Sequence, residues 1–271
     1  KKGVKLDKLV QILFVNTNHE ESRMMQTRNL FVLEDFAEAQ IFERHQAFNQ
    51  GHVFSNSVTE SSVGNQAHFK HFKLQNDLDS SSMVDSTFVK QGANSSALVD
   101  TFAFSGELVR NNLHFEFTGM HAEAHMDAIT LLKGKSLVDH HTFVDHAVPH
   151  CQSNQLYKGI YDEKSKGVFN GKVMVRKDAQ KTNAFQQNNN LLLSDFSSID
   201  TKPQLEIFAD DVACSHGCTI GQLDEEALFY MQTRGIPLKE AKAFLMFAFA
   251  GDTLKNITIP ELKTQLINLV A

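Results

Sequence analysis

The stretch "LHFEF", residues 113–117, indicates the fold class. Its apolar residues Leu113, Phe115 and Phe117 alternate with His114 and Glu116. In an extended chain the three apolar side chains therefore lie on one face and the two polar side chains lie on the other. This period of two is typical of a half-buried β-strand.

Similar short apolar runs recur as far as residue 208. They are "AITLL" (128–132), "KVMVR" (172–176), "NLLLS" (190–194) and "QLEIF" (204–208). The gaps between them carry Gly, Asn and Ser, which tolerate the dihedral angles of turns. Because few stretches of helical spacing interrupt residues 50–205, the sequence predicts an all-β sandwich, barrel or β-helix. Asn-rich turns favour a β-helix, although the sequence has no clear repeat period.

The composition of the 271 residues, 42% hydrophobic and 21% charged, is that of an ordinary globular protein. A net charge of -6 gives no general attraction for nucleic acid. We find neither the long apolar run of a membrane helix nor the pattern of a signal peptide. Three cysteines argue against a disulfide framework and fit a reducing compartment. We therefore expect a cytoplasmic protein without nucleic-acid or membrane partners, and the 22 phenylalanines predict a Phe-rich core.

The chain changes character near residue 210, and after Gly221 the pattern becomes helical. The segment "QLDEEALFYMQTRG" (222–235) has acidic residues in its first turn and ends on Gly235, as helices often do. Two more helices are predicted, over "PLKEAKAFLMFAFAGDTL" (237–254) and "TIPELKTQLINLV" (258–270). We therefore expect a β core over residues 1–209 and a small helical domain over residues 210–271.

The first of three stretches that could bind a metal is "MHAEAHMD" (120–127), in which His121, Glu123, His125 and Asp127 alternate. On a strand these side chains share one face, and imidazoles with carboxylates can ligate a transition metal. Strand neighbours on one face lie about 7 Å apart and do not by themselves converge on one ion. A solvated strand face over a core face of small residues is the favoured interpretation.

The second stretch, "LVDHHTFVDHAVPHC" (137–151), is rich in histidine and has aspartates beside the histidines. Its candidate ligands are His140, His141, His146, His150, Cys151, Asp139 and Asp145. On a strand the adjacent His140 and His141 point to opposite faces and cannot both serve one site. Polar side chains stacked and hydrogen-bonded within or between coils are the favoured alternative to a metal site.

The third stretch, "DDVACSHGCTIGQLDEEALFY" (210–230), contains Cys214, His216 and Cys218, which share one face if the chain is extended. Gly217 could introduce a turn that separates them. The spacing is not that of a structural zinc site, and no second Cys pair completes it. The thiols can equally be small buried hydrophobes, so both interpretations stay open. No nucleophile elbow, Walker A loop or dinucleotide fingerprint occurs in the chain.

Several long stretches resemble the SufD branch of the SufB/SufD family, which belongs to the SUF system of iron–sulfur cluster assembly. They are "VDHHTFVDHAVPHCQSNQLYKGIY" (138–161), "KDAQKTNAFQQNNNLLLS" (177–194) and "IDTKPQLEIFADDVACSHGCTIGQLDEEALFYMQTRGI" (199–236), with a weaker match over "RNLFVLEDFAEAQIFERH" (28–45). The resemblance implies a right-handed parallel β-helix followed by a small helical domain. Members usually begin with a helical N-terminal region, whereas this sequence begins within the β region.

The resemblance also implies a function. Members are not enzymes but subunits of a SufB–SufC–SufD scaffold. The β-helix pairs with SufB, and the C-terminal helices dock the SufC ATPase, whose ATP-driven dimerisation reshapes the SufB–SufD interface where a cluster is built. We expect Phe229, Tyr230 and Arg234 to contact SufC, with packing among the helices as the alternative for the two aromatic residues. An isolated chain is expected to form a homodimer through its exposed sheet edges.

The family places a SufD histidine near a SufB cysteine in that interface, and the "CSHG" motif carries this role to His216, with Cys214 just before it. Cys218 stands where the family pattern has another residue. Iron–sulfur clusters prefer thiolate ligands, with histidine as a substitute. One cysteine and one histidine are too few, so we expect a transient cluster shared with SufB and none held stably by the isolated chain. The alternative function is a β-helix metalloprotein or metalloenzyme that uses the histidine-rich stretches.

Overall fold

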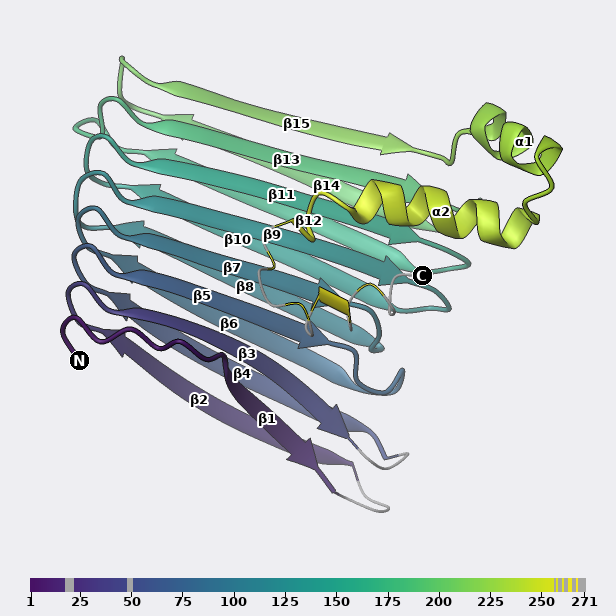
Figure 1. Cartoon of the computed structure of the whole chain (residues 1–271), viewed down its shortest axis with the longest axis horizontal. Coiled ribbons are helices and arrows are strands. Elements are labelled where there is room, and N and C mark those ends of the chain that lie inside the picture. The colour runs from purple at the N-terminus through teal and green to yellow at the C-terminus, as the bar shows by residue number, and fades with distance from the viewer. Residues whose placement is uncertain are drawn as a thin grey trace.

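The computed structural model describes residues 1–17, 22–47 and 51–255, together with residues 257, 260, 263, 264 and 267. Over this part of the chain, fifteen strands wind into a parallel β-helix of about seven turns, and two α-helices follow (Figure 1). The predicted β-helix with C-terminal helices is therefore confirmed, and the sandwich and the barrel are excluded.

Each turn of the β-helix contributes one strand to each of two sheets, so that strands two apart in the sequence are hydrogen-bonded neighbours. The eight-stranded sheet contains β1 (Val10–Asn16), β3 (Glu38–Ala47), β5 (His68–Gln75), β7 (Ser96–Ala103), β9 (Glu123–Leu132), β11 (Gln152–Tyr161), β13 (Asn183–Leu192) and β15 (Ala213–Gly221). The seven-stranded sheet contains β2 (Arg23–Leu33), β4 (Val53–Val63), β6 (Ser82–Gln91), β8 (Leu108–Phe117), β10 (Leu137–His146), β12 (Lys166–Val175) and β14 (Ser198–Ile207).

The turns differ in length, which explains why the sequence shows no clear period. In the seven-stranded sheet the paired strand starts Ser82, Leu108, Leu137, Lys166 and Ser198 lie directly above one another. Their residue numbers are unevenly spaced, with the shortest interval from Ser82 to Leu108 and the longest from Lys166 to Ser198. The strands keep their register because the connections between them absorb these differences.

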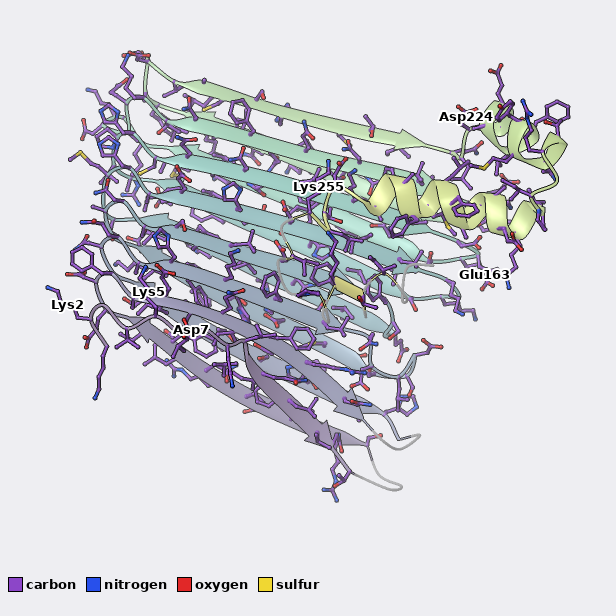
Figure 2. The ribbon with its side chains drawn as sticks, in the orientation of Figure 1. Lys2, Lys5, Asp7, Glu163, Asp224 and Lys255 are labelled. Carbon is purple, nitrogen blue, oxygen red and sulfur yellow. The ribbon has the colours of Figure 1, made fainter. Side chains whose placement is uncertain are left out.

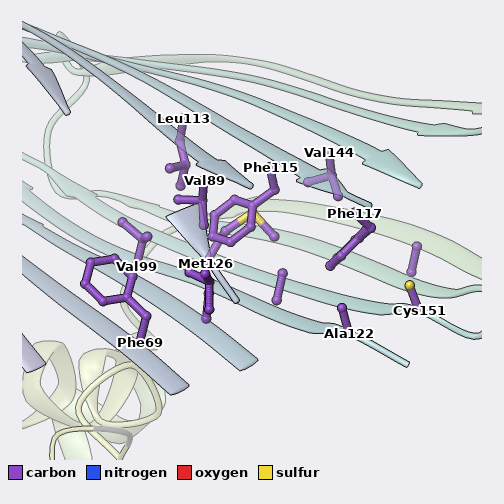
Figure 3. Close-up of a cluster of buried hydrophobic side chains, with 14 of the residues drawn as sticks. Phe69, Val89, Val99, Leu113, Phe115, Phe117, Ala122, Met126, Val144 and Cys151 are labelled. Carbon is purple, nitrogen blue, oxygen red and sulfur yellow. The ribbon is translucent and has the colours of Figure 1, made fainter. Parts of the chain in front are cut away.

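The alternation in "LHFEF" has the predicted meaning. Leu113, Phe115 and Phe117 of β8 are buried inside the β-helix, while His114 and Glu116 face outward. Figure 3 shows the three apolar side chains among residues from several turns, both sheets included. The Phe-rich core is also confirmed, since six phenylalanines are among the largest fully buried side chains: Phe69, Phe72, Phe102, Phe115, Phe117 and Phe169.

The β structure continues past residue 209, the predicted end of the β core. β15 (Ala213–Gly221) pairs in parallel with β13 and forms the last strand of the eight-stranded sheet. The first helix, α1 (Glu225–Thr233), begins only after this strand. The expected boundary at residue 210 therefore lies before the last strand, because residues 213–221 pair with β13 and the helices follow that strand.

The two helices are attached unequally to the β-helix. α2 (Leu238–Ala250) lies across the outer face of the eight-stranded sheet (Figure 1). The buried Lys158 of β11 donates hydrogen bonds to the Phe249 carbonyl at 2.7 Å and to Asp252 Oδ2 at 2.9 Å, which fixes the end of α2. By contrast, α1 has no buried residue. Most of the predicted third helix over 258–270 lies outside the described residues.

A covering of apolar side chains from the C-terminal segment closes over part of this outer face. Ala250, Leu254 and Ile257 pack against a cluster that includes Leu98 and Phe102 of β7. Asp100 lies between these two on the same face and is only 1% exposed. Among the described residues, neither of its carboxyl oxygens has a hydrogen-bond partner. Burial raises the pKa of Asp100 well above its usual value, and the nearby Asp127 raises it further, against an opposing effect of Lys70.

This arrangement predicts that Asp100→Asn stabilises the protein at neutral pH. A carboxyl whose pKa is raised by folding contributes its full stability below its unfolded pKa of about 3.9, and that stability is lost as the pH rises toward the folded pKa. Because asparagine does not ionise, we expect the variant to gain about 1–3 kcal/mol at pH 8 and less at pH 5. Urea unfolding at both pH values measures the difference, with the exposed Asp79→Asn as control. An equal or opposite effect at the two pH values would contradict the prediction.

Candidate functional site

The motif with Cys214, His216 and Cys218 lies on β15, at one end of the β-helix. Among the described strands β15 has a hydrogen-bonded neighbour on one side only, β13, so its other edge is free. The strand runs unbroken through Gly217, and the turn that this glycine could introduce does not occur. The three side chains therefore share one face, as an extended chain requires.

That face is the inward one. Cys214 pairs with Ala184, His216 with Gln186 and Cys218 with Asn188, and all three partners are buried inside the β-helix. The side chains of Cys214, His216 and Cys218 form a row along β15. The preceding turn, which contains β13, covers this row on one side, and no described turn covers it on the other. This is why His216 and Cys218 are exposed although they continue the buried rows of β13.

The two thiols of this row have different surroundings. Cys214 is half-buried and packs against the main apolar core. Burial raises the pKa of its thiol, and a backbone hydrogen bond at Ala184 opposes the shift. Cys218 is exposed, and its Sγ lies 3.1 Å from Thr201 Oγ1 of β14 and 3.9 Å from Asn188 Oδ1. Cys214 is therefore the more apolar and Cys218 the more accessible sulfur.

The row does not form a complete metal site. Within the described part of the chain, no group of three or more His, Cys, Asp and Glu side chains is placed to hold one ion. Cα atoms two residues apart on a strand are separated by about 6.8 Å, so Cys214 and Cys218 are about 13.5 Å apart along the strand. With a metal–sulfur distance of about 2.3 Å, one ion can bind His216 together with either Cys214 or Cys218, but it cannot bind the two thiols at once. An ion at this row would need further ligands from outside the described part of the chain.

The first histidine stretch is a strand face over a small-residue core, as the favoured interpretation predicted. Ala122, Ala124 and Met126 are fully buried in the main core, whereas Glu123 and His125 point outward. Burial lowers the pKa of His125, with the opposing charge of Glu123 as a smaller effect. His121 does not join these two outward residues, and Asp127 lies on their face of β9 but is covered. His121 lies in the turn before β9 with φ 60°, and Asp127 is buried.

The second histidine stretch is divided between the inside and the outside of the β-helix. His140 is buried; its Nδ1 accepts from Asn111 Nδ2 at 3.4 Å, and its Nε2 then donates to Thr130 Oγ1 at 2.9 Å. Burial lowers its pKa to about 3, so that the imidazole is neutral. His141 points outward and pairs with Asp139 at 3.0 Å. The prediction that these neighbours serve different faces is confirmed.

The remaining members of this stretch are also apart from one another. His146 is buried, with Nε2 2.9 Å from Ser153 Oγ, and burial lowers its pKa to about 4. His150 lies in a turn and stacks on His121 with ring centroids 4.9 Å apart. Cys151 is buried and Asp145 is paired with Arg176. Hydrogen bonding within and between coils therefore accounts for the buried histidines, and the described geometry lends no support to a metalloenzyme centre here.

The three residues of the helical unit that are predicted to contact a partner lie on α1 or at its end. Phe229 is 68% exposed and Tyr230 is 59% exposed, so packing between α1 and α2 leaves both rings accessible. Arg234 donates to Tyr230 Oη at 3.2 Å and lies over the same ring. Figure 2 shows Asp224, which caps the start of α1, at the far end of the helical unit from Lys255.

Two residues near the motif escaped sequence reasoning. Gln186 is 1% exposed, lies directly below His216 in the preceding turn, and has no hydrogen-bond partner for either amide atom within the part of the chain that the structure describes. Thr201 comes from the opposite sheet and meets Cys218. Neither is near the motif in the sequence, and only the winding of the chain brings them to it.

Comparison with known proteins agrees with the resemblance. Residues 14–249 match the family model described as "SUF system FeS cluster assembly, SufBD core domain". The chain is 35% identical over 270 residues to a SufBD family iron–sulfur cluster assembly protein of Synechocystis, covering 97% of this chain and 60% of that protein. It is 32% identical over 250 residues to SufD of Escherichia coli, covering 92% and 59%.

A third relative, the chloroplastic protein ABCI7 of Arabidopsis thaliana, is 33% identical over 277 residues, covering 99% of this chain and 58% of that protein. The chain thus spans about three fifths of the length of these relatives. Among the described helices, none combines the length and the apolar character that crossing a membrane requires. By the family model and by its relatives, the chain is a SufD-like member of the SufB/SufD family of iron–sulfur cluster assembly proteins.

Proposed function

We propose that this chain is a non-enzymatic subunit of a SufB–SufC–SufD scaffold, in which it supplies part of a cluster-binding site. The observation that carries the proposal is the position of His216 on the free edge strand of the β-helix. A free edge presents unpaired backbone N–H and C=O groups that another strand can pair with. A SufB β-helix added at this edge would meet the row of Cys214, His216 and Cys218 directly.

The surroundings of the edge suit an interface. Ile207 and Phe208 at the end of β14 and Ile220 on β15 are exposed apolar side chains. Such residues, together on one end of the molecule, favour burial against a partner. A second copy of the chain can use the same edge, which is the basis for the homodimer that we expect when SufB is absent.

A site divided between two subunits suits transient assembly of a cluster. This chain offers one imidazole and at most one thiol to a given iron, and SufB would complete the ligands. Because neither subunit alone holds the cluster, opening the interface weakens its binding. The cluster is cargo that the complex builds and passes on. The three cysteines are free thiols, which is consistent with a reducing cytoplasm.

The helical unit has a separate role, the docking of SufC. Phe229, Tyr230 and Phe244 expose aromatic surface, and α1 buries none of its own residues. α1 starts shortly after the end of β15, and the end of α2 is fixed to β11 through Lys158. A displacement of α1 by the ATPase would therefore act on the edge strand while the rest of the β-helix stays in place.

His216→Ala in the co-expressed complex tests the site. We expect the complex to assemble, because His216 is exposed in the single chain, but to retain iron–sulfur cluster at least about tenfold more weakly. Absorbance and iron content after reconstitution measure this. Ser215→Ala, on the same strand with its side chain on the opposite face, is the matched control. Cluster content equal to that of the unsubstituted complex would remove His216 from the ligands.

The double variant Phe229→Ala/Tyr230→Ala tests the docking of SufC. We expect it to lose capture of SufC while it still co-purifies with SufB, because the two surfaces are on different elements. The control is Phe88→Ala, which removes an exposed aromatic side chain from the outer face of the seven-stranded sheet. If the double variant binds SufC as well as the control does, α1 is not the docking surface.

A further inference from the structure

The row on β15 offers two thiols beside His216, and the structure distinguishes between them. Each is two residues from His216, so spacing alone favours neither. The Cys214 side chain is half-buried against the apolar core, and a metal there would have to displace that packing. The Cys218 side chain is exposed and needs no rearrangement to meet a ligand from above.

The polar contacts favour the same sulfur. Thr201 Oγ1 lies 3.1 Å from Cys218 Sγ, so its hydroxyl can donate a hydrogen bond to a thiolate. Asn188 Oδ1, at 3.9 Å, accepts from the thiol when it is protonated. Hydrogen-bond donors around a ligand sulfur are a regular feature of metal–thiolate sites.

An independent observation points to a ligand at this end of the β-helix. Gln186 is buried one turn below His216, and both of its amide atoms lack a partner among the residues described. Its amide crosses the interior as far as β12, where a Cβ at Gly171 would lie 2.3 Å from Nε2. Buried amides are nearly always hydrogen-bonded. An imidazole that turns inward when it binds a metal would provide the missing partner and would be held in one tautomer by it.

We infer that the pair of ligands contributed by this chain is His216 and Cys218, with Gln186 as a positioning residue beneath the imidazole, and that Cys214 is a core residue. The inference rests on the proposed function and replaces the pair Cys214 and His216 expected from the motif. The ligand is a thiophilic divalent metal, which in the complex is iron of the nascent cluster.

Cobalt(II) alone, added to the isolated full chain, is the probe. We expect a weak thiolate-to-cobalt charge-transfer absorption that is kept by Cys214→Ala and lost by Cys218→Ser and by His216→Ala. Alkylation followed by mass spectrometry gives a second readout, in which cobalt slows the labelling of Cys218 and leaves that of Cys214 unchanged. Thermal unfolding of each variant shows that the loss is local.

The opposite pattern, with absorption lost in Cys214→Ala and kept in Cys218→Ser, overturns the inference, as does the absence of any charge-transfer absorption. Protection of Cys218 that survives His216→Ala also overturns it. These outcomes are independent of the proposed function, which fails instead if His216→Ala leaves cluster content in the complex unchanged.

Gln186→Met tests the positioning role, since methionine fills a similar volume without hydrogen bonds. We expect several-fold weaker cobalt binding together with an unchanged or higher unfolding temperature, because the substitution removes unsatisfied polar atoms. Gln186→Glu, which keeps an acceptor below the imidazole, should restore binding. Unchanged cobalt affinity in Gln186→Met would show that Gln186 does not position His216.

Discussion

The whole molecule depends on the parallel hydrogen-bond ladder that joins each turn of the β-helix to the next. A turn in the middle is paired on both sides, so that its backbone groups are satisfied and its inward side chains are covered from above and below. Among the described strands, β15 is paired with β13 alone. The same row of positions that is buried in β13 is therefore open in β15, and this incomplete pairing leaves Cys214, His216 and Cys218 without a described turn above them.

The interior of the β-helix explains why abundant histidine does not signal a metal centre. Inward polar side chains bond across the interior to the opposite sheet or to the neighbouring turn. Lys73 donates to Thr87 at 2.7 Å and pairs with Asp85, and Glu43 lies 3.1 Å from the ring nitrogens of both His45 and His71. His140 and His146 belong to the same kind of network. A buried polar group is stabilised by a hydrogen-bond partner, and for these histidines the stacked turns supply at least one, so their burial does not indicate a metal.

The attachment of the helices suggests how motion would reach the edge strand. α2 is fixed by Lys158 and by the apolar cluster around Leu254, whereas α1 is largely solvated. Local stability follows the number of buried contacts, so α1 and the connection to β15 are the parts that can move without unfolding the β-helix. The ion pair Lys158–Asp252 and the buried carboxyl of Asp100 lie on the same outer face on which this covering segment packs.

Local sequence patterns were sufficient to establish the strand class, the Phe-rich core, the position of α1 and α2, and the motif around His216. Each of these depends on residues within a few positions of each other: the alternation in "LHFEF", and the acidic first turn and Gly235 at the ends of α1. Only the folded chain shows that β15 runs straight through Gly217, that Cys214 is packed while Cys218 is open, and that Gln186 and Thr201 meet the motif. These features depend on which turn lies below β15 and on the lack of a described turn above it. The winding of the chain brings these side chains together. Because the turns are of unequal length, no fixed spacing in the sequence shows which residues become neighbours.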